Sequence, residues 1–285
     1  MIKNFIYDVG LHTGEDTAFY LAKGFKVLAF EANPILVASA EKRFAAEIAE
    51  GRLQIISGAI CDSTANYISF YKKEGNSELG TIESDWVKKN EIYSGSVEEI
   101  KVPVVRMKDI LAKFGVPYYM KIDVEGVDRI CVNSLRYFEE KPEYLSLELE
   151  RSSFDDARLD LNLLVELGYS SFALVNQQSI PGTYLDNDQR EGSVISWRFP
   201  RSCSGAFGQD IKGNWIKAPV ALKKIKQLFL AYRIFGDSSF LKNLKVGRYN
   251  IGSESINLFQ KILKRPVPGW HDLHAKISKN GDARD

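Results

Sequence analysis

A glycine-containing turn near the start of the chain is the first feature that could do chemistry. Residues 8–17 read Asp-Val-Gly-Leu-His-Thr-Gly-Glu-Asp-Thr and follow an apolar run. Gly10 and Gly14 lack a Cβ, so the backbone can approach a ligand there, and the amides of a following helix would face an anionic group. Glu31 ends the next apolar run, 21 residues beyond Gly10. This spacing suits a carboxylate that accepts hydrogen bonds from both hydroxyls of a ribose, so the pattern predicts a nucleoside site.

The spacing of the glycines separates two classes of nucleoside cofactor. Dinucleotides favour G-x-G-x-x-G, whereas this chain has G-x-x-x-G with His12 between the glycines. Asp8, Glu15 and Asp16 would also repel a doubly charged pyrophosphate. A sulfonium cofactor tolerates these acids, because Asp8 could attract its amino group or sulfonium and Thr17 could donate to its carboxylate. We therefore expect a sulfonium cofactor and keep an NAD-type nucleotide-binding oxidoreductase as the alternative.

Acidic residues end two later apolar runs. Asp123 and Glu125 follow one run, and Glu148 and Glu150 end the next. Ligands of doubly wound sheets bind beyond the carboxyl ends of the strands, so these carboxylates are expected on one rim. A placed base accelerates transfer to an alcohol roughly 10²–10⁴-fold, and crowded like charges raise the pKa of at least one carboxylate. We expect Glu125 or Glu148 as the base and Asp123 as an orienting residue on the cofactor side, and we assign no metal.

The chain around these residues alternates between strand and helix patterns. Expected strands span residues 4–8, 25–31, 53–60, 118–123 and 144–150, and expected helices span 15–23, 35–50, 107–114, 127–138 and 155–167. Strands that are apolar throughout indicate a parallel sheet covered on both faces. Residues 172–175 and 193–199 are expected to pair as an antiparallel hairpin. Residues 72–96 form a long excursion, in which residues 75–81 could close over the cofactor as a lid.

The same motifs resemble those of a known family. The matching segments are Asp8–Gly14, Phe30–Pro34, Lys121–Gly126, Leu147–Glu150, Ser204–Gly208 and Gly269–Asp272. In these segments the chain resembles the class I S-adenosylmethionine-dependent methyltransferases of the FkbM type. The family usually has Asn where this chain has His12.

This resemblance implies an α/β fold of the Rossmann-like, doubly wound kind, with a mostly parallel seven-stranded sheet and a terminal antiparallel hairpin. It also implies methyl transfer from S-adenosyl-L-methionine to a hydroxyl, with Ala59 and Ile60 against adenine. The expected cofactor-binding residues are Asp8, Gly10, His12, Thr13, Gly14, Thr17, Glu31, Ala32, Ala59, Ile60 and Asp123, and the expected catalytic residues are Asp123, Glu125 and Glu148. A non-catalytic module that keeps the cofactor fold is a second alternative.

Composition limits the class of protein. The chain has 285 residues with 38 basic and 37 acidic side chains, a balance that argues against a nucleic-acid-binding protein. Apolar residues make up 45%, which excludes wholesale disorder. Three widely spaced cysteines fit neither a zinc site nor a disulfide framework. No apolar run is long enough to span a bilayer and no leader pattern is evident, so a cytoplasmic protein is expected.

The chain changes character after residue 205. We expect residues 1–205 to form the methyltransferase domain and residues 206–285 a basic, largely helical appendage. Residues 210–265 hold twelve lysines and arginines against three acidic residues, which would suit an anionic small-molecule or glycan acceptor. His271 and His274 have helical spacing and are expected on a packed tail with their side chains in solvent. Whether the chain forms a homo-oligomer is left open.

Overall fold

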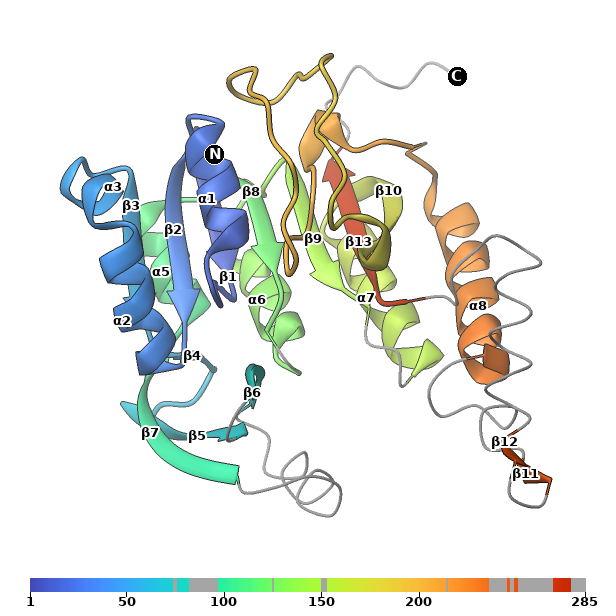
Figure 1. Ribbon diagram of the computed structural model, residues 1–285, viewed down its shortest axis with the longest axis horizontal. Helices are drawn as coiled ribbons and strands as arrows, with labels where there is room; N and C mark the ends of the chain where they lie inside the picture. The colour runs from blue at the N-terminus through green and yellow to red at the C-terminus, as the bar shows by residue number, and fades with distance from the viewer. Residues whose placement is uncertain are drawn as a thin grey trace.

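One sheet of seven strands organises the chain. In the order in which they lie side by side, its strands are β10 (Tyr169–Asn176), β13 (His271–Ile277), β9 (Tyr144–Glu148), β8 (Pro117–Ile122), β1 (Ile2–Val9), β2 (Lys26–Glu31) and β3 (Leu53–Ser57). Neighbouring strands are parallel except where β13 pairs with β10 and β9. The computed structural model (Figure 1) describes residues 1–73, 76–81, 97–124, 126–149, 153–213, 215–235, 245–246, 249–250 and 269–277.

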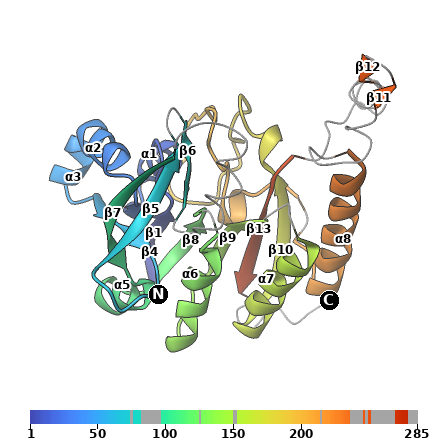
Figure 2. The same cartoon turned by 90° about the horizontal axis from the view of Figure 1, so that it is seen from below.

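Helices cover both faces of this sheet (Figure 2). On one face lie α1 (Glu15–Ala22), α2 (Pro34–Arg43) and α3 (Ala45–Ala49), and on the other lie α5 (Met107–Phe114), α6 (Asp128–Ser134) and α7 (Phe154–Glu166). All six residues of β8 are buried, as expected for a central parallel strand. The Rossmann-like, mostly parallel seven-stranded sheet is therefore confirmed.

Local sequence signals fix where the helices begin. The side chain of Asn33 accepts from the amide of Ile35 at 3.0 Å, and Pro34 occupies the first helical position of α2. Ser153 caps α7 in the same way, through the amide of Asp156 at 3.1 Å. Short 3-10 helices follow at Leu135–Tyr137, Gln177–Ser179 and Gly208–Asp210.

The expected third strand, residues 53–60, is divided between two sheets. β3 ends at Ser57, and the amide of Gly58 donates to the carbonyl of Glu31 at 2.9 Å. A second sheet then begins, with the order β4 (Ala59–Ile60), β7 (Val97–Val105), β5 (Tyr67–Lys73) and β6 (Asn76–Thr81). The expected lid therefore contains a strand, because β6 pairs with β5. Its closure over a cofactor stays a prediction, and residues 74–75 and 82–96 lie outside the described residues.

The expected hairpin partner of β10 is wrong. Residues 193–199 make only an isolated bridge, between Tyr184 and Arg198, whereas β10 pairs along its length with β13. The helical tail expected around His271 and His274 is likewise a strand, and His274 is buried rather than solvated. Asp272, Leu273, His274 and Ala275 are all buried, as expected for a strand that lies inside a sheet covered on both faces.

The C-terminal segment contributes to this sheet and to one of its helical layers. β13 lies between β9 and β10, so residues 271–277 belong to the main sheet. For the other residues after 205, the expected division into two domains stays a prediction. α8 (Ala218–Phe235) packs against α7 and β10. The apolar stripe of this helix is buried at Ala221, Ile225, Phe229 and Tyr232. β11 (Lys245–Val246) and β12 (Tyr249–Asn250) form a separate pair. Among the described helices, none has the length and apolar character that crossing a membrane requires.

Candidate active site

The turn after β1 packs directly on the end of β8. The amides of Gly10 and Leu11 donate to the carbonyl of Phe30 at 3.1 and 2.8 Å, which joins the turn to β2. Gly10 has φ +95°, and a Cβ built on it would lie 2.0 Å from the carbonyl oxygen of Asp123. Only glycine fits this position, because any side chain would collide with backbone.

The other end of the turn is fixed by α1 and α2. Gly14 precedes α1 with φ +84°, and a Cβ there would lie 2.6 Å from the ring of Phe44. Arg43 of α2 donates to the carbonyl of Thr13 at 2.6 Å and pairs with Glu15 at 2.8 Å. Contacts from α1 and α2 thus hold the turn on both sides. The free backbone amides at the start of α1 lie beyond the carboxyl ends of the parallel strands.

His12 adopts a backbone conformation that explains the residue types accepted there. Its φ is +50°, in the left-handed region that Asn, Asp and His enter more readily than other non-glycine residues. The Asn usual in the family and the His of this chain therefore meet the same backbone requirement. The Nδ1 atom of His12 lies 3.4 Å from the hydroxyl of Thr13.

Glu31 presents a fixed carboxylate beside the turn. Its Oε2 accepts from the amide of His12 at 2.9 Å, and its Oε1 accepts from the amide of Asn33 at 2.8 Å. Burial raises the pKa of Glu31, and these hydrogen bonds oppose the rise. A carboxylate oxygen has two acceptor positions, so both oxygens can also accept from a pair of vicinal hydroxyls. The structure thus brings Gly10, His12 and Glu31 together, as the sequence predicts.

A buried lysine lies behind the turn and was not given a role from the sequence. Lys121 Nζ lies 3.5 Å from Asp8 Oδ1, 3.2 Å from Asp16 Oδ2 and 3.3 Å from Asp123 Oδ2. It also donates to the carbonyl of Gly10 at 3.3 Å. Burial alone would lower the pKa of Lys121, but the surrounding carboxylates outweigh it and raise the pKa well above its usual value. Lys121 is therefore a fixed cation that ties the turn to β8.

Asp8 and Thr17 are fully buried beneath this turn. The hydroxyl of Thr17 donates to Asp8 Oδ2 at 2.6 Å, so it orients Asp8 instead of reaching the surface. Asp8 Oδ1 has no hydrogen-bond partner among the described residues. Burial raises the pKa of Asp8 to about 6, although Lys121 opposes the rise. An incompletely satisfied acid beneath a glycine cradle suits a ligand with a positively charged group, so these residues fit a sulfonium cofactor.

The predicted adenine residues lie on the other side of Glu31. Ala59 and Ile60 are buried in β4, opposite Val104 and Val105 of β7. Ala32 packs against the small apolar cluster that contains Ala59. Their contact with adenine stays a prediction.

The predicted catalytic carboxylates lie beyond β8 and β9. The side chain of Asp123 is 48% exposed, and its amide donates to the carbonyl of Val9 at 2.9 Å. Glu148 is the last residue of β9, and Glu125 and Glu150 lie outside the described residues. The strand register adds Asp272 of β13, which pairs with Glu148. Sequence reasoning missed Asp272, although Asp272, His274 and Lys276 alternate with apolar residues in the way that indicates a strand.

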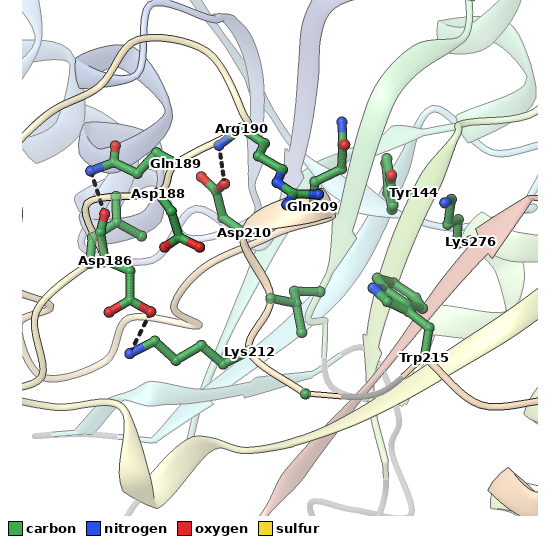
Figure 3. A pocket seen from close by; sticks show the side chains of 13 residues that line it. Tyr144, Asp186, Asp188, Gln189, Arg190, Gln209, Asp210, Lys212, Trp215 and Lys276 are labelled. Carbon is green, nitrogen blue, oxygen red and sulfur yellow. Dashed lines mark hydrogen bonds and ion pairs between the residues drawn. The ribbon is translucent and has the colours of Figure 1, made fainter.

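A pocket of about 360 Å³ opens at the opposite end of the strands from the glycine turn (Figure 3). Its wall includes Tyr144, the first residue of β9, whereas the site residues follow the carboxyl ends of the parallel strands. Lys212 pairs with Asp186 at 2.7 Å, and Asp210 accepts from the amide of Arg190 at 2.6 Å. The pocket is therefore separate from the candidate active site.

Comparison with known proteins places these motifs in a family. The family model described as the methyltransferase FkbM domain matches residues 8–171, more than half of the chain. Among curated proteins, none matches this chain.

Similar solved structures are distant. Methyltransferase FkbM from Methylobacillus flagellatus KT shares 19% identity with a TM-score of 0.41, over 60% of this chain and 40% of that one. An S-adenosylmethionine-dependent methyltransferase from Archaeoglobus fulgidus shares 8% identity with a TM-score of 0.38, over 96% of this chain and 86% of that one. The assignment rests on the family match, which spans the glycine turn, Glu31 and Asp123: the chain belongs to the FkbM methyltransferase family, whose cofactor is S-adenosyl-L-methionine.

Proposed function

We propose that this chain transfers a methyl group from S-adenosyl-L-methionine to a hydroxyl of a small-molecule acceptor, such as a sugar, a glycan or a natural product. The arrangement of Glu31 supports this most strongly, because two backbone amides fix its carboxylate beside the glycine turn. When bound, the cofactor supplies a methyl group on a positively charged sulfur. The protein must then position the acceptor at close distance and take its proton.

The residues around the turn divide the task of binding. Glu31 accepts from the two hydroxyls of the ribose, and Gly10 leaves room for the ligand to approach the backbone. Asp8 and Lys121 determine the charge beneath the glycine turn. The remaining proposed cofactor-binding residues are His12, Thr13, Gly14, Ala32, Ala59, Ile60 and Asp123, and Thr17 acts through Asp8, to which its hydroxyl donates.

The acceptor side is formed by the carboxylates at the ends of β8 and β9. We propose that Asp123 orients the cofactor and the acceptor. We also propose that the base is one of these carboxylates, and the sequence favours Glu125 or Glu148. No metal takes part in this scheme. The basic segment of residues 210–265 supports an anionic acceptor, and the proposed setting is the cytoplasm.

Calorimetry with three ligands tests the cofactor part of this proposal. S-adenosyl-L-methionine and S-adenosylhomocysteine should bind, and NAD should not. Glu31→Gln should weaken both by about tenfold to a hundredfold, because it removes a charged acceptor and turns an amide NH₂ toward a backbone N–H. Glu41→Gln, on the exposed side of α2, is the matched control and should leave both affinities unchanged. Tight NAD binding without S-adenosylhomocysteine binding would overturn the proposal.

Turnover tests the acceptor. The protein is incubated with methyl-labelled cofactor and a panel of methyl glycosides and sugar phosphates, and products are read by mass. Asp123→Asn should reduce methylation at least about a hundredfold if it positions the reacting groups. Labelled product on nitrogen or carbon alone would contradict hydroxyl transfer. An anionic acceptor predicts a KM that rises with ionic strength.

A further inference from the structure

Three carboxylates lie in one row across β8, β9 and β13. Asp272 pairs with Glu148 in the antiparallel register. Leu147 pairs with Ile122 in the parallel register, so Asp123 comes beside Glu148 where the two strands end. Side chains at facing positions of a sheet point to the same side, so the three carboxylates share one rim.

Asp272 is buried in this row, with an exposed fraction of 7%. Among the residues that the structure describes, its carboxylate has neither a hydrogen bond nor an ion pair. Buried carboxylates are almost always paired or hydrogen-bonded. An unpaired one at the rim of a ligand site indicates that a ligand or a proton completes it.

The groups that face Asp272 come from each element packed beside it. Asp123 and Glu148 face it from β8 and β9, Lys121 from within β8, and Asp16 from α1. On β10 its partner is the apolar Val175. Burial and the carboxylates raise the pKa of Asp272 well above its usual value, and Lys121 opposes them only in part.

A ligand in the turn would lie close to this row. Gly10 touches the backbone of Asp123, so a ligand resting on the turn reaches the first carboxylate of the row. Neighbouring strands are about 4.8 Å apart, which places Asp272 two strands further along, on the side away from Glu31. Because the ribose would lie beside Glu31, the acceptor would bind on this opposite side.

We propose that Asp272 accepts the proton of the acceptor hydroxyl, and that a positively charged ligand in the turn favours its ionised form over its protonated form. The inference rests on the proposed function and refines it, because it assigns the base to Asp272 instead of Glu125 or Glu148. A sulfonium beside the row favours the ionised carboxylate, which is the form that can act as a base.

The charges balance over the transfer. The oxygen–carbon bond forms as the carbon–sulfur bond breaks with its electron pair going to sulfur, and the hydroxyl proton moves to Asp272. One carboxylate and one sulfonium thus become a carboxylic acid and a neutral thioether. Loss of the positive charge raises the proton affinity of Asp272 at the step in which the acceptor loses its proton.

Proton release on binding tests this without knowledge of the acceptor. Isothermal titration calorimetry of the full chain is run near neutral pH in buffers of different ionisation enthalpy, with S-adenosyl-L-methionine and with S-adenosylhomocysteine. The sulfonium ligand should release up to about one proton and the thioether close to none. Its affinity should rise with pH by up to about tenfold per unit, whereas the thioether affinity should stay level.

Variants assign the proton to one residue. Asp272→Asn should abolish most of the release and still bind S-adenosylhomocysteine, and Asp272→Glu should restore it. Asp155→Asn removes one exposed carboxylate of α7, which pairs with Arg158, and should release as wild type does. Equal release for both ligands in the wild-type protein overturns the inference even if Asp272→Asn fails to fold. Loss of the release in Glu148→Gln alone also overturns it. Failure of the wild-type protein to bind either ligand would instead refute the proposed function.

Discussion

The carbonyl oxygen of Asp123 occupies the space that a side chain on Gly10 would need. A Cβ at residue 10 would lie 2.0 Å from that oxygen. The peptide group that carries this oxygen is held on both sides, because the amide of Val124 donates to Asp128 at 3.1 Å and the amide of Asp123 donates to the carbonyl of Val9 at 2.9 Å. The ligand turn and the first acidic residue of the rim are therefore one rigid unit.

This contact predicts the effect of Gly10→Ala. The variant should lose roughly 2–4 kcal/mol of unfolding free energy, measured by urea denaturation, because it adds a backbone collision to a left-handed φ. Gly51→Ala is a matched control, since Gly51 also has a positive φ but a Cβ there meets nothing within 4 Å. It should cost about 1 kcal/mol. Equal losses in the two variants would show that conformational strain alone matters.

Removal of the buried lysine should unfold the site. Lys121→Met leaves Asp8 and Asp16 without the cation that lies between them. Breaking a buried ion pair in this way costs roughly 3–5 kcal/mol. The loss should shrink as the pH falls below about 6, where Asp8 takes up a proton. Lys26→Met, at the exposed start of β2, should change stability by no more than about 0.5 kcal/mol. A similarly small effect at Lys121 would contradict the central role given to its charge.

Asp8 should make the protein more stable as the pH falls. Its pKa is raised to about 6 in the folded state, above the ordinary value near 4, so the folded protein holds the extra proton between these values. Unfolding free energy should therefore rise as pH falls from about 6 to about 4, by up to about 3 kcal/mol. Comparison with Asp8→Asn isolates this contribution. A difference between the two proteins that does not vary with pH would contradict it.

His274 should act in the opposite direction over a similar range. Burial lowers the pKa of His274 to about 4. Between this pH and the ordinary pKa of histidine, His274 is therefore protonated in the unfolded chain and neutral in the folded protein. Its contribution to unfolding free energy should fall by about 3 kcal/mol between pH of about 6.5 and 4. In His274→Leu this acid-induced loss should disappear, as read from denaturation curves at several pH values. A loss of the same size in the variant would show that other groups cause it.

Local patterns predicted that the glycine turn and Glu31 lie side by side. Gly10 and Glu31 each end an apolar strand, and neighbouring parallel strands bring their carboxyl ends together, so their proximity follows from two short segments. The break at Gly58 was harder to predict, because Ala59 and Ile60 are as apolar as the strand before them. Only their pairing with Val104 and Val105 separates them from β3.

The proposed acceptor side of the site depends on contacts between strands that are far apart in the sequence. Asp272 meets Glu148 across 124 positions of chain, and no local feature of either residue indicates the other. The three-residue spacing of His271 and His274 suggested a helix, whereas pairing with β9 and β10 makes the segment a strand. Lys121 was visible in its motif, but its role came from Asp8 and Asp16 on two other elements.

The position of β13 also constrains how the chain matures on the ribosome. β10 is joined to the main sheet through β13, which is synthesised about a hundred residues later. Until residues 271–277 leave the exit tunnel, the nascent chain therefore exposes an unpaired edge on β9 and a detached β10. Translation that stops before residues 271–277 should therefore leave a product prone to aggregation, because β10 and the edge of β9 then lack their shared partner strand.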